Sequence, residues 1–215
     1  MKRILLLLPF LFLYAPLRAD TLKIGAFGGE GLAGWEERSF KGNTLYSLVA
    51  LDGRRVVHAV SEGAASGMFR EMRIDLDKNP WLNWSWRVEK LLPGRDERSR
   101  GGDDYPARIY VVFSGGLFFW KTRALNYVWS GSQAPGTTWP NAYTGNAVML
   151  SVETGAKNLG GWMSYRRNIK EDARRYLGED YRYVDAVAIM TDTDNGGGQA
   201  SAYYGDIYFT SQEEE

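Results

Sequence analysis

Hydrophobic and polar residues alternate with a period of two along most of this chain. Trp84, Trp86 and Val88 share one face of such a segment, while Ser85 and Arg87 take the other. The same alternation, or a short apolar run, occurs at 45–50, 54–60, 108–113, 125–129, 147–152, 184–190 and 203–209. This periodicity indicates β-strands, and Gly-rich breaks separate them. Many short strands in one chain predict an all-β fold, an antiparallel β-sandwich of jelly-roll type.

Two local signals refine this pattern. Asp52-Gly53 is a strong turn pair, so the segments on either side of it are expected to form a hairpin. Residues 168–178 instead predict one short helix, in which Asn168 caps the start and Glu171 completes a capping-box-like pair. Gly178 is expected to end the helix in a left-handed conformation. The apolar stripe of this helix consists of Ile169, Ala173, Tyr176 and Leu177.

The first 19 residues have the three parts of a secretory signal. Lys2 and Arg3 precede an apolar stretch over 4–17, and Ala19 ends a passable cleavage site. The stretch is shorter than the roughly 20 residues of a membrane-spanning helix. We therefore expect a signal peptide over 1–19, a single β-sandwich domain over 20–215, a periplasmic or secreted location, and no membrane span after cleavage. An uncleaved N-terminal anchor is the alternative.

Composition then excludes several kinds of chemistry. The chain has no Cys and a single His, His58, which excludes disulfides, thiolate nucleophiles, Cys-ligated metals and sites that need two His. Lys plus Arg equals Asp plus Glu, at 26 each. Residues 1–19 carry three basic residues and no acid, so 23 basic against 26 acidic residues remain without them. This balance argues against a nucleic-acid partner. His58 itself, on a predicted strand, fits a structural role better than a general base.

Three polar segments are candidates for a site: 101–108, 139–143 and 191–198. Asp192, Asp194 and Asn195 offer oxygen ligands on a Gly-rich loop, as Ca²⁺ requires, although the spacing differs from an EF-hand. The alternative is a cluster of Asx-turns that closes a hairpin. Asp104 and its neighbour Asp103 likewise either contribute to a site or anchor a turn and pair with an arginine.

Glycan recognition would use aromatic faces for the apolar side of a sugar, with amides, carboxylates and guanidinium groups for its hydroxyls. The residues of suitable type are Asp104, Arg108, Asn126, Trp129, Trp139, Asn141, Tyr143 and Arg166. The alternative is that the tryptophans belong to the core, which is the expected place for Trp84 and Trp86. Trp139, beside Pro140 in a polar loop, is expected at the surface. No known catalytic motif is present, yet a carboxylate pair or a Tyr–Arg elimination site stays open.

Several motifs together carry a resemblance to a family. They are 65–67, 82–88, 102–111, 124–129, 167–168, 185–195 and 202–207. In this order they resemble the domain of unknown function numbered 3047, whose activity is not settled and which is similar in outline to extracellular proteins. The early Glu30 and the late Asp206 also resemble the pair that holds a structural calcium in jelly-roll carbohydrate-binding modules. That weaker resemblance implies a calcium site at these two residues.

These observations predict an exported, noncatalytic protein that binds a polysaccharide or an envelope glycan. The alternative is a polysaccharide-active enzyme, a lyase or hydrolase, that uses Asp, Arg and Tyr side chains. A purely structural partner in the cell envelope is a third possibility. The only cofactor expected is structural calcium.

Overall fold

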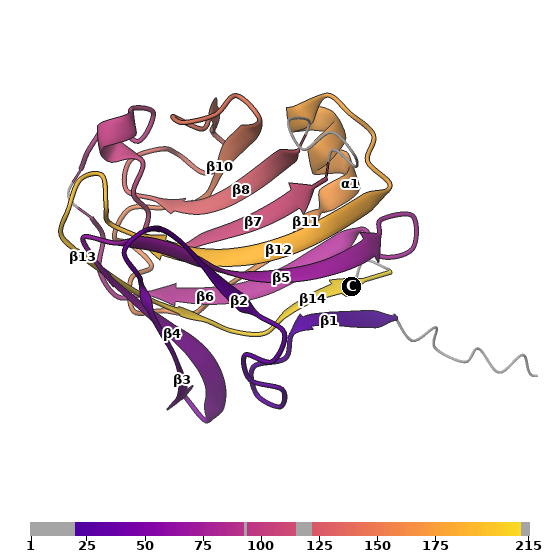
Figure 1. Ribbon diagram of the computed structural model, residues 1–215, viewed down its shortest axis with the longest axis horizontal. Helices are drawn as coiled ribbons and strands as arrows, with labels where there is room; N and C mark the ends of the chain where they lie inside the picture. Colours follow the sequence, from indigo (N-terminus) through magenta and orange to yellow (C-terminus); the bar gives the residue numbers. More distant parts are fainter. Residues whose placement is uncertain (1–19, 93, 115–121, 212–215) are drawn as a thin grey trace, which may run out of the picture.

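The computed structural model describes residues 20–92, 94–114 and 122–211, which form two β-sheets packed face to face (Figure 1). The first sheet has the order β1 (Thr21–Gly25), β14 (Ile207–Thr210), β6 (Trp81–Val88), β13 (Gln199–Tyr204), β4 (Arg54–Glu62) and β3 (Leu45–Leu51), with β11 (Met163–Asn168) on the other edge of β6. The second has the order β2 (Glu36–Lys41), β5 (Ala65–Asp75), β12 (Tyr183–Asp192), β7 (Arg108–Phe113), β8 (Arg123–Ser130), β10 (Ala147–Thr154) and β9 (Thr138–Pro140).

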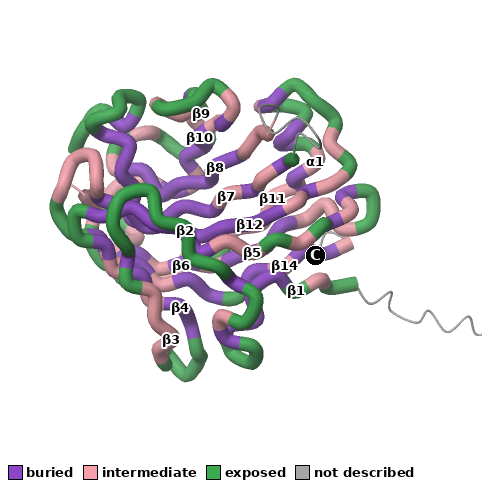
Figure 2. The backbone as a smooth tube through the Cα atoms, in the orientation of Figure 1, coloured by how far each residue is buried: buried purple, intermediate pink, exposed green. Residues whose placement is uncertain are grey.

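The strand pairs of the described residues are antiparallel except one, since β10 runs parallel to β8. A parallel pair needs a longer connection than a hairpin, and here residues 131–146 make it, passing through β9. The predicted all-β jelly-roll sandwich is otherwise confirmed. Figure 2 shows the buried backbone concentrated along the central strands, with exposed residues in β2 and in the loops.

The core lies between the sheets and is rich in aromatic rings. Trp84 and Trp86 point inward, as their alternation predicts, and are 2% and 0% exposed. The ring of Trp86 lies 6.4 Å from that of Trp129 on the opposite sheet, and the ring of Trp84 lies 5.2 Å from that of Tyr127. Offset and edge contacts of this kind add to the free energy gained by burying such large side chains.

The two local predictions are also confirmed. Asp52 and Gly53 both have positive φ, 52° and 74°, and join β3 to β4 as a tight hairpin. The Asn168 side chain accepts the backbone N–H of Glu171 at the start of α1 (Ile169–Asp172), which continues as one π-helical turn, η3 (Ala173–Leu177). Gly178 follows in the left-handed region, with φ 75°.

The expected signal peptide, 1–19, lies outside the described residues. No helix within the described ranges is long and apolar enough to cross a membrane. The division into a signal and one domain therefore stays a prediction.

Two outward faces remain, one for each sheet. On the second sheet the pairing register places Phe69, Ala188, Tyr110, Asn126 and Met149 in one row across five strands. Because side chains alternate along each strand, residues two positions along each strand from this row form a second row on the same outward face. That row includes Met190, Arg108 and Val128, so the predicted site residue Arg108 lies on this face.

Candidate functional site

Three loops meet at one end of the second sheet, and they are the three polar segments that the sequence singles out. They precede β7, follow β9 and follow β12. Asn141 donates its Nδ2 to Asp103 Oδ2 at 3.1 Å, and Tyr143 donates its hydroxyl to Asn195 Oδ1. Asn195 in turn donates its Nδ2 to Asp104 Oδ1 at 3.2 Å. The tertiary structure thus brings together side chains that lie far apart in the sequence.

Arg108 is the centre of this assembly, and its guanidinium is surrounded by the protein's own acceptors. It is 2% exposed and donates its Nε to Asp192 Oδ1 at 2.7 Å, with a second bond to Asp192 Oδ2. A third N–H binds the backbone oxygen of Asp103, and Nη1 donates to the Tyr110 hydroxyl at 3.1 Å. With four of its five N–H groups hydrogen-bonded within the protein, Arg108 positions the neighbouring groups and has little left to offer a ligand.

The charged groups here titrate far from their ordinary ranges. Burial raises the pKa of Asp192 to about 7, although Arg108 opposes this shift. Burial also raises the pKa of Asp103, again against the nearby Arg108, whose Nη1 lies 3.6 Å from Asp103 Oδ1. The pKa of the Tyr110 hydroxyl is raised to about 12, mainly by burial. Tyr110 is therefore a neutral phenol at neutral pH, and Asp192 is close to its midpoint.

A pocket of about 380 Å³ opens beside these groups on the outward face of the second sheet. We call it the aromatic pocket, and its lining residues are Phe40, Ala65, Asp103, Arg108, Tyr110, Asn141, Tyr143, Met190, Asp192, Asp194 and Asn195. Phe40 and Tyr143 are 65% and 52% exposed. Among the described residues only one other large hydrophobic side chain, Leu45, is exposed. Two of the three exposed hydrophobic side chains thus border one polar cavity.

Several predicted site residues line the aromatic pocket, and others lie elsewhere. Arg108, Asn141, Tyr143, Asp192, Asp194 and Asn195 are in the lining. Asp104 is not in the lining, but its carboxylate accepts the backbone N–H groups of Asn195, which is in the lining, and of Gly196. Asn126 is 0% exposed, and neither atom of its amide has a hydrogen-bond partner within the described chain.

Trp129 and Trp139, both predicted as glycan-binding residues, are buried, which matches the alternative that the tryptophans belong to the core. Trp129 follows the alternation of β8 into the core and is 0% exposed. Trp139 is 4% exposed, because β9 pairs with β10 and places it opposite Met149. There it packs in a small apolar cluster with Tyr105 and Val128. The polar residues around Trp139 in the sequence gave no sign of this pairing.

Arg166 lies on the other sheet. It borders a groove of about 430 Å³ on the outward side of β6, β11 and β14. This groove has its own residues and chemistry, and it does not belong with the aromatic pocket.

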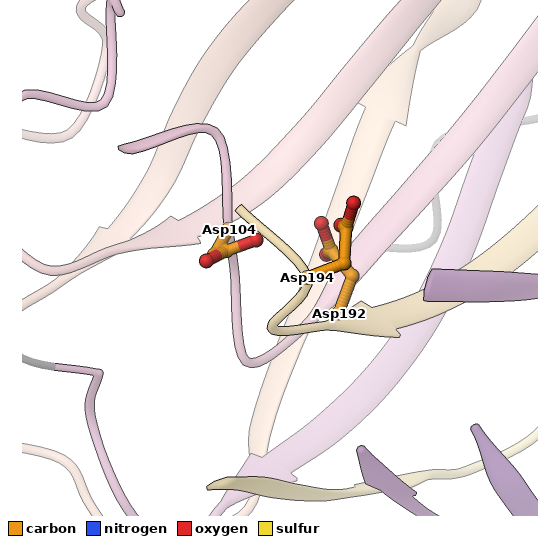
Figure 3. Close-up of side chains that lie close together, drawn as sticks. All are labelled: Asp104, Asp192 and Asp194. Atoms are coloured by element: carbon orange, nitrogen blue, oxygen red, sulfur yellow. The ribbon is translucent and has the colours of Figure 1, made fainter. Parts of the chain in front are cut away.

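The acidic residues of the expected calcium site are only partly brought together. Carboxylate oxygens of Asp104, Asp192 and Asp194 lie within 4.8 Å of one another (Figure 3). Asp192 and Asp194 stand at the end of β12, and Asp104 approaches from the loop before β7. Glu30 and Asp206, both exposed, join no such group of three in the described part of the chain, and Asp206 Oδ1 accepts the N–H of Phe27 at 2.8 Å.

The donors around these carboxylates do not fit a calcium cage. Both oxygens of Asp104 accept N–H bonds, and both oxygens of Asp192 accept bonds from Arg108. Asp192 Oδ1 also faces the N–H of Tyr105 at 3.3 Å. Calcium would have to displace these donors to gain its oxygen ligands. The arrangement matches the alternative, a turn held by Asp and Asn hydrogen bonds, and calcium stays a prediction to be tested.

Sequence reasoning missed two aromatic residues of the aromatic pocket, Phe40 and Tyr110. Phe40 belongs to β2, whose six residues are all exposed and show no alternation that would mark one of them. Tyr110 lies in a strand that reads as largely buried, and only its register beside Asn126 and Ala188 shows that it points outward. A period-two count along β7 from Arg108 would have placed Tyr110 on the same face.

Two sheets packed face to face with this strand order define a jelly-roll β-sandwich. The chain belongs to the family described as "protein of unknown function (DUF3047)", which matches residues 33–208. The resemblance inferred from the sequence motifs is confirmed. No curated protein matches the chain in sequence.

The solved structures that resemble this chain are distant from it in sequence. The family 30 carbohydrate-binding module of the cellulase Cel9D-Cel44B of Clostridium thermocellum has a TM-score of 0.52 at 9% identity, over 91% of this chain and 99% of that chain. The family 11 module of Lic26A-Cel5E of the same organism has 0.48 at 10%, over 94% and 99%. The glycoside hydrolase domain of Endo-D from Streptococcus pneumoniae has 0.46 at 7%, over 84% of this chain but 22% of that chain. At these identities the likeness is one of fold.

Proposed function

We propose that this protein is an exported, noncatalytic glycan-binding protein that holds its ligand in the aromatic pocket. The observation that carries the proposal is the placement of Phe40 and Tyr143. They are the exposed large aromatic side chains of the described chain, and both border the same polar cavity. An apolar ring left in water beside polar groups is typical of a binding surface.

Sugars match this mixture of groups. The C–H face of a sugar ring packs against an aromatic plane, while its hydroxyls need donors and acceptors. Tyr110 donates its hydroxyl only to the sulfur of Met190, at 3.6 Å, which is a weak acceptor that a sugar oxygen would outcompete. The half-buried carboxylate of Asp194 also borders the pocket and accepts one bond, at Oδ1, from Asn195. The rings of Phe40 and Tyr143 would contact the face of a sugar, and the Tyr110 hydroxyl and the Asp194 carboxylate would bind its hydroxyls.

An exported location belongs to the same proposal. It rests on the secretory pattern of residues 1–19 alone, and the ligand would then be a polysaccharide or an envelope glycan. Separation of periplasm, medium and cytoplasm from cells that express the full chain would test it. Full-length, uncleaved protein in the cytoplasm would contradict export.

Affinity electrophoresis through gels that contain soluble polysaccharides tests the binding. The wild type should be retarded by at least one polymer, and Phe40→Ala and Tyr143→Ala should each weaken that binding about tenfold, the equivalent of about 1.4 kcal/mol. Leu45→Ala is the matched control, because it removes an exposed hydrophobic side chain that does not line the pocket. Tyr143→Phe separates the ring from the hydroxyl that binds Asn195.

Two results would overturn the proposal. One is the absence of retardation by every polymer in a broad panel of neutral and charged polysaccharides. The other is retardation that Leu45→Ala weakens as much as Phe40→Ala does. Melting curves of the variants confirm that each one is folded.

The enzymatic alternative has one supporting observation, since Tyr110 and Arg108 lie hydrogen-bonded beside carboxylates in the same pocket. The pKa of Tyr110, raised by burial to about 12, argues against a phenolate base. Release of reducing ends, or absorbance from an unsaturated product, would reveal a hydrolase or lyase. Activity that Tyr110→Phe abolishes would replace the noncatalytic proposal.

A further inference from the structure

The outward face of the first sheet holds a second cavity, the groove of about 430 Å³ that contains Arg166. We call it the arginine groove. Its lining includes Arg54, Arg55, Arg166, Asn83, Ser85 and Ser164. Its volume falls within the range of about 300–1,000 Å³ that is usual for small-molecule sites.

The floor of the arginine groove is built by strand pairing. Asn83 of β6 lies opposite Arg166 of β11 on one side and Tyr208 of β14 on the other, and Ser85 lies opposite Ser164. At Gly205 the chain passes directly over Ser85, and an added Cβ would come within 2.3 Å of the Ser85 Oγ. Glycine at this position therefore keeps β13 and β14 close to β6, and the groove lies along this junction.

The groove carries an excess of positive charge. Arg54, Arg55 and Arg166 line it, against a single acid, Asp206. The net charge of the lining is therefore +2, from three guanidinium groups and one carboxylate. Asp206 Oδ1 already accepts the N–H of Phe27 at 2.8 Å. Arg54 and Arg55 are exposed, and neither makes a hydrogen bond or ion pair among the contacts found in the described ranges.

Two of these guanidinium groups lie against tryptophan rings. The Cζ atom of Arg54 lies 3.7 Å from the centroid of the Trp162 ring, and that of Arg166 lies 4.8 Å from the centroid of Trp81. Trp162 is itself held in place, because its Nε1 donates to Asp52 Oδ2 at 2.9 Å. Stacking on the face of Trp162 leaves the N–H groups at the edge of the Arg54 guanidinium able to bind an anion in the plane.

We propose that the arginine groove binds the anionic groups of an acidic polysaccharide. Guanidinium groups recognise carboxylate and sulfate oxygens through paired N–H donors, while Asn83, Ser85 and Ser164 offer shorter polar groups for sugar hydroxyls. The groove lies on the first sheet and the aromatic pocket on the second. This proposal therefore does not depend on the function proposed for the aromatic pocket. Carboxylated and sulfated polymers share the recognised chemistry, and the experiment separates them.

Affinity electrophoresis at about 150 mM salt tests the groove with polygalacturonate, with dextran sulfate and with uncharged dextran. The wild type should be retarded by at least one charged polymer, and the better of the two identifies the anionic group. Arg54→Gln with Arg55→Gln should weaken this binding tenfold or more. Gly28→Asp should do the same, because an added Cβ at Gly28 meets no atom within 4 Å and the new carboxylate repels the ligand without disturbing the fold.

Arg73→Gln is the matched control. Arg73 is exposed and its Cζ lies 4.0 Å from the ring centroid of Tyr183, so this variant removes one charge and one ring contact outside the groove. It should change the affinity less than twofold. An equal loss in Arg73→Gln and in the groove variants would show attraction by overall charge and would overturn the proposal.

Two further results would also overturn it. One is the absence of retardation by both charged polymers at this salt concentration. The other is binding of the charged polymer that Phe40→Ala abolishes while the groove variants retain it, since that result assigns the anion to the aromatic pocket. Loss of neutral-glycan binding in Phe40→Ala with intact binding of the charged polymer supports two separate sites.

Discussion

The two outward faces of this sandwich handle charge in opposite ways. In the aromatic pocket the lining contains three carboxylates and one guanidinium, and the guanidinium is buried and hydrogen-bonded to the protein's own oxygens. In the arginine groove the lining contains three guanidinium groups and one carboxylate, and two of the guanidinium groups are exposed. Buried, paired charges shape a site, whereas exposed cations are available to a ligand. We therefore assign a structural role to Arg108 and a role in ligand binding to Arg54 and Arg55.

The largest expected effect follows from this assignment. Arg108→Ala, measured at pH 8, should lower the free energy of unfolding by about 3–5 kcal/mol, because the buried Asp192 loses its ion-pair partner and must either stay charged without it or take up a proton. Arg54→Gln should change it by less than about 0.5 kcal/mol. Chemical denaturation of both variants checks the difference. The double variant Arg108→Ala with Asp192→Ala should recover part of the lost free energy of unfolding. An Arg108→Ala variant as stable as the wild type would contradict the structural role of Arg108.

A smaller effect concerns the pH dependence of stability. Burial raises the pKa of Asp192 from 3.8 to about 7, so between these values the folded state binds more protons than the unfolded state. The free energy of unfolding should therefore fall as pH rises, by on the order of 2 kcal/mol between pH 5 and pH 8. Asp103 and Glu97, whose pKa values burial also raises, act in the same direction. His58, whose pKa burial lowers, acts in the opposite direction.

Denaturation at several pH values measures this dependence. Asp192→Asn should flatten the decline between pH 5 and pH 8. Stability that rises steadily from pH 5 to pH 8 in the wild type would contradict the burial argument.

The affinity for ligands should depend on salt concentration at one surface and much less at the other. Binding at the arginine groove depends on exposed charge and should weaken about tenfold when NaCl rises from 50 to 500 mM. Binding at the aromatic pocket depends on ring contacts and hydrogen bonds, and should change less than twofold. Titration of charged and neutral ligands at both salt concentrations tests this, and an equal salt dependence for both ligands would remove the distinction.

The smallest expected effect is that of calcium. Because Asp104 and Asp192 already accept N–H donors, a chelator should move the melting temperature by less than about 1 °C. Melting curves with chelator and with added calcium check this. A clear fall on chelation, reversed by calcium, would support the calcium site at Asp192, Asp194 and Asn195.

Local sequence signals predicted the fold well because each one acts over a few residues. The alternation around Trp84 and Trp86 placed both rings in the core, and Asp52-Gly53 forms the expected turn. The same alternation in 125–129 already places Trp129 beside core residues. Trp139 was misplaced, because its burial depends on the pairing of β9 with β10 and on Tyr105, which comes from another loop.

The sequence by itself determined the strand periodicity, the capped helix, the family and the types of side chain from which a site can be built. Only the tertiary structure decided which of those side chains meet. Arg108 and Asp192 lie 84 positions apart, and Arg54 and Trp162 come from different strands and loops. The physical reason is that the alternation along a strand indicates which face a residue occupies, whereas strand order and register decide its neighbours across the sheet. Those depend on long-range packing of the whole sandwich, which no local pattern records.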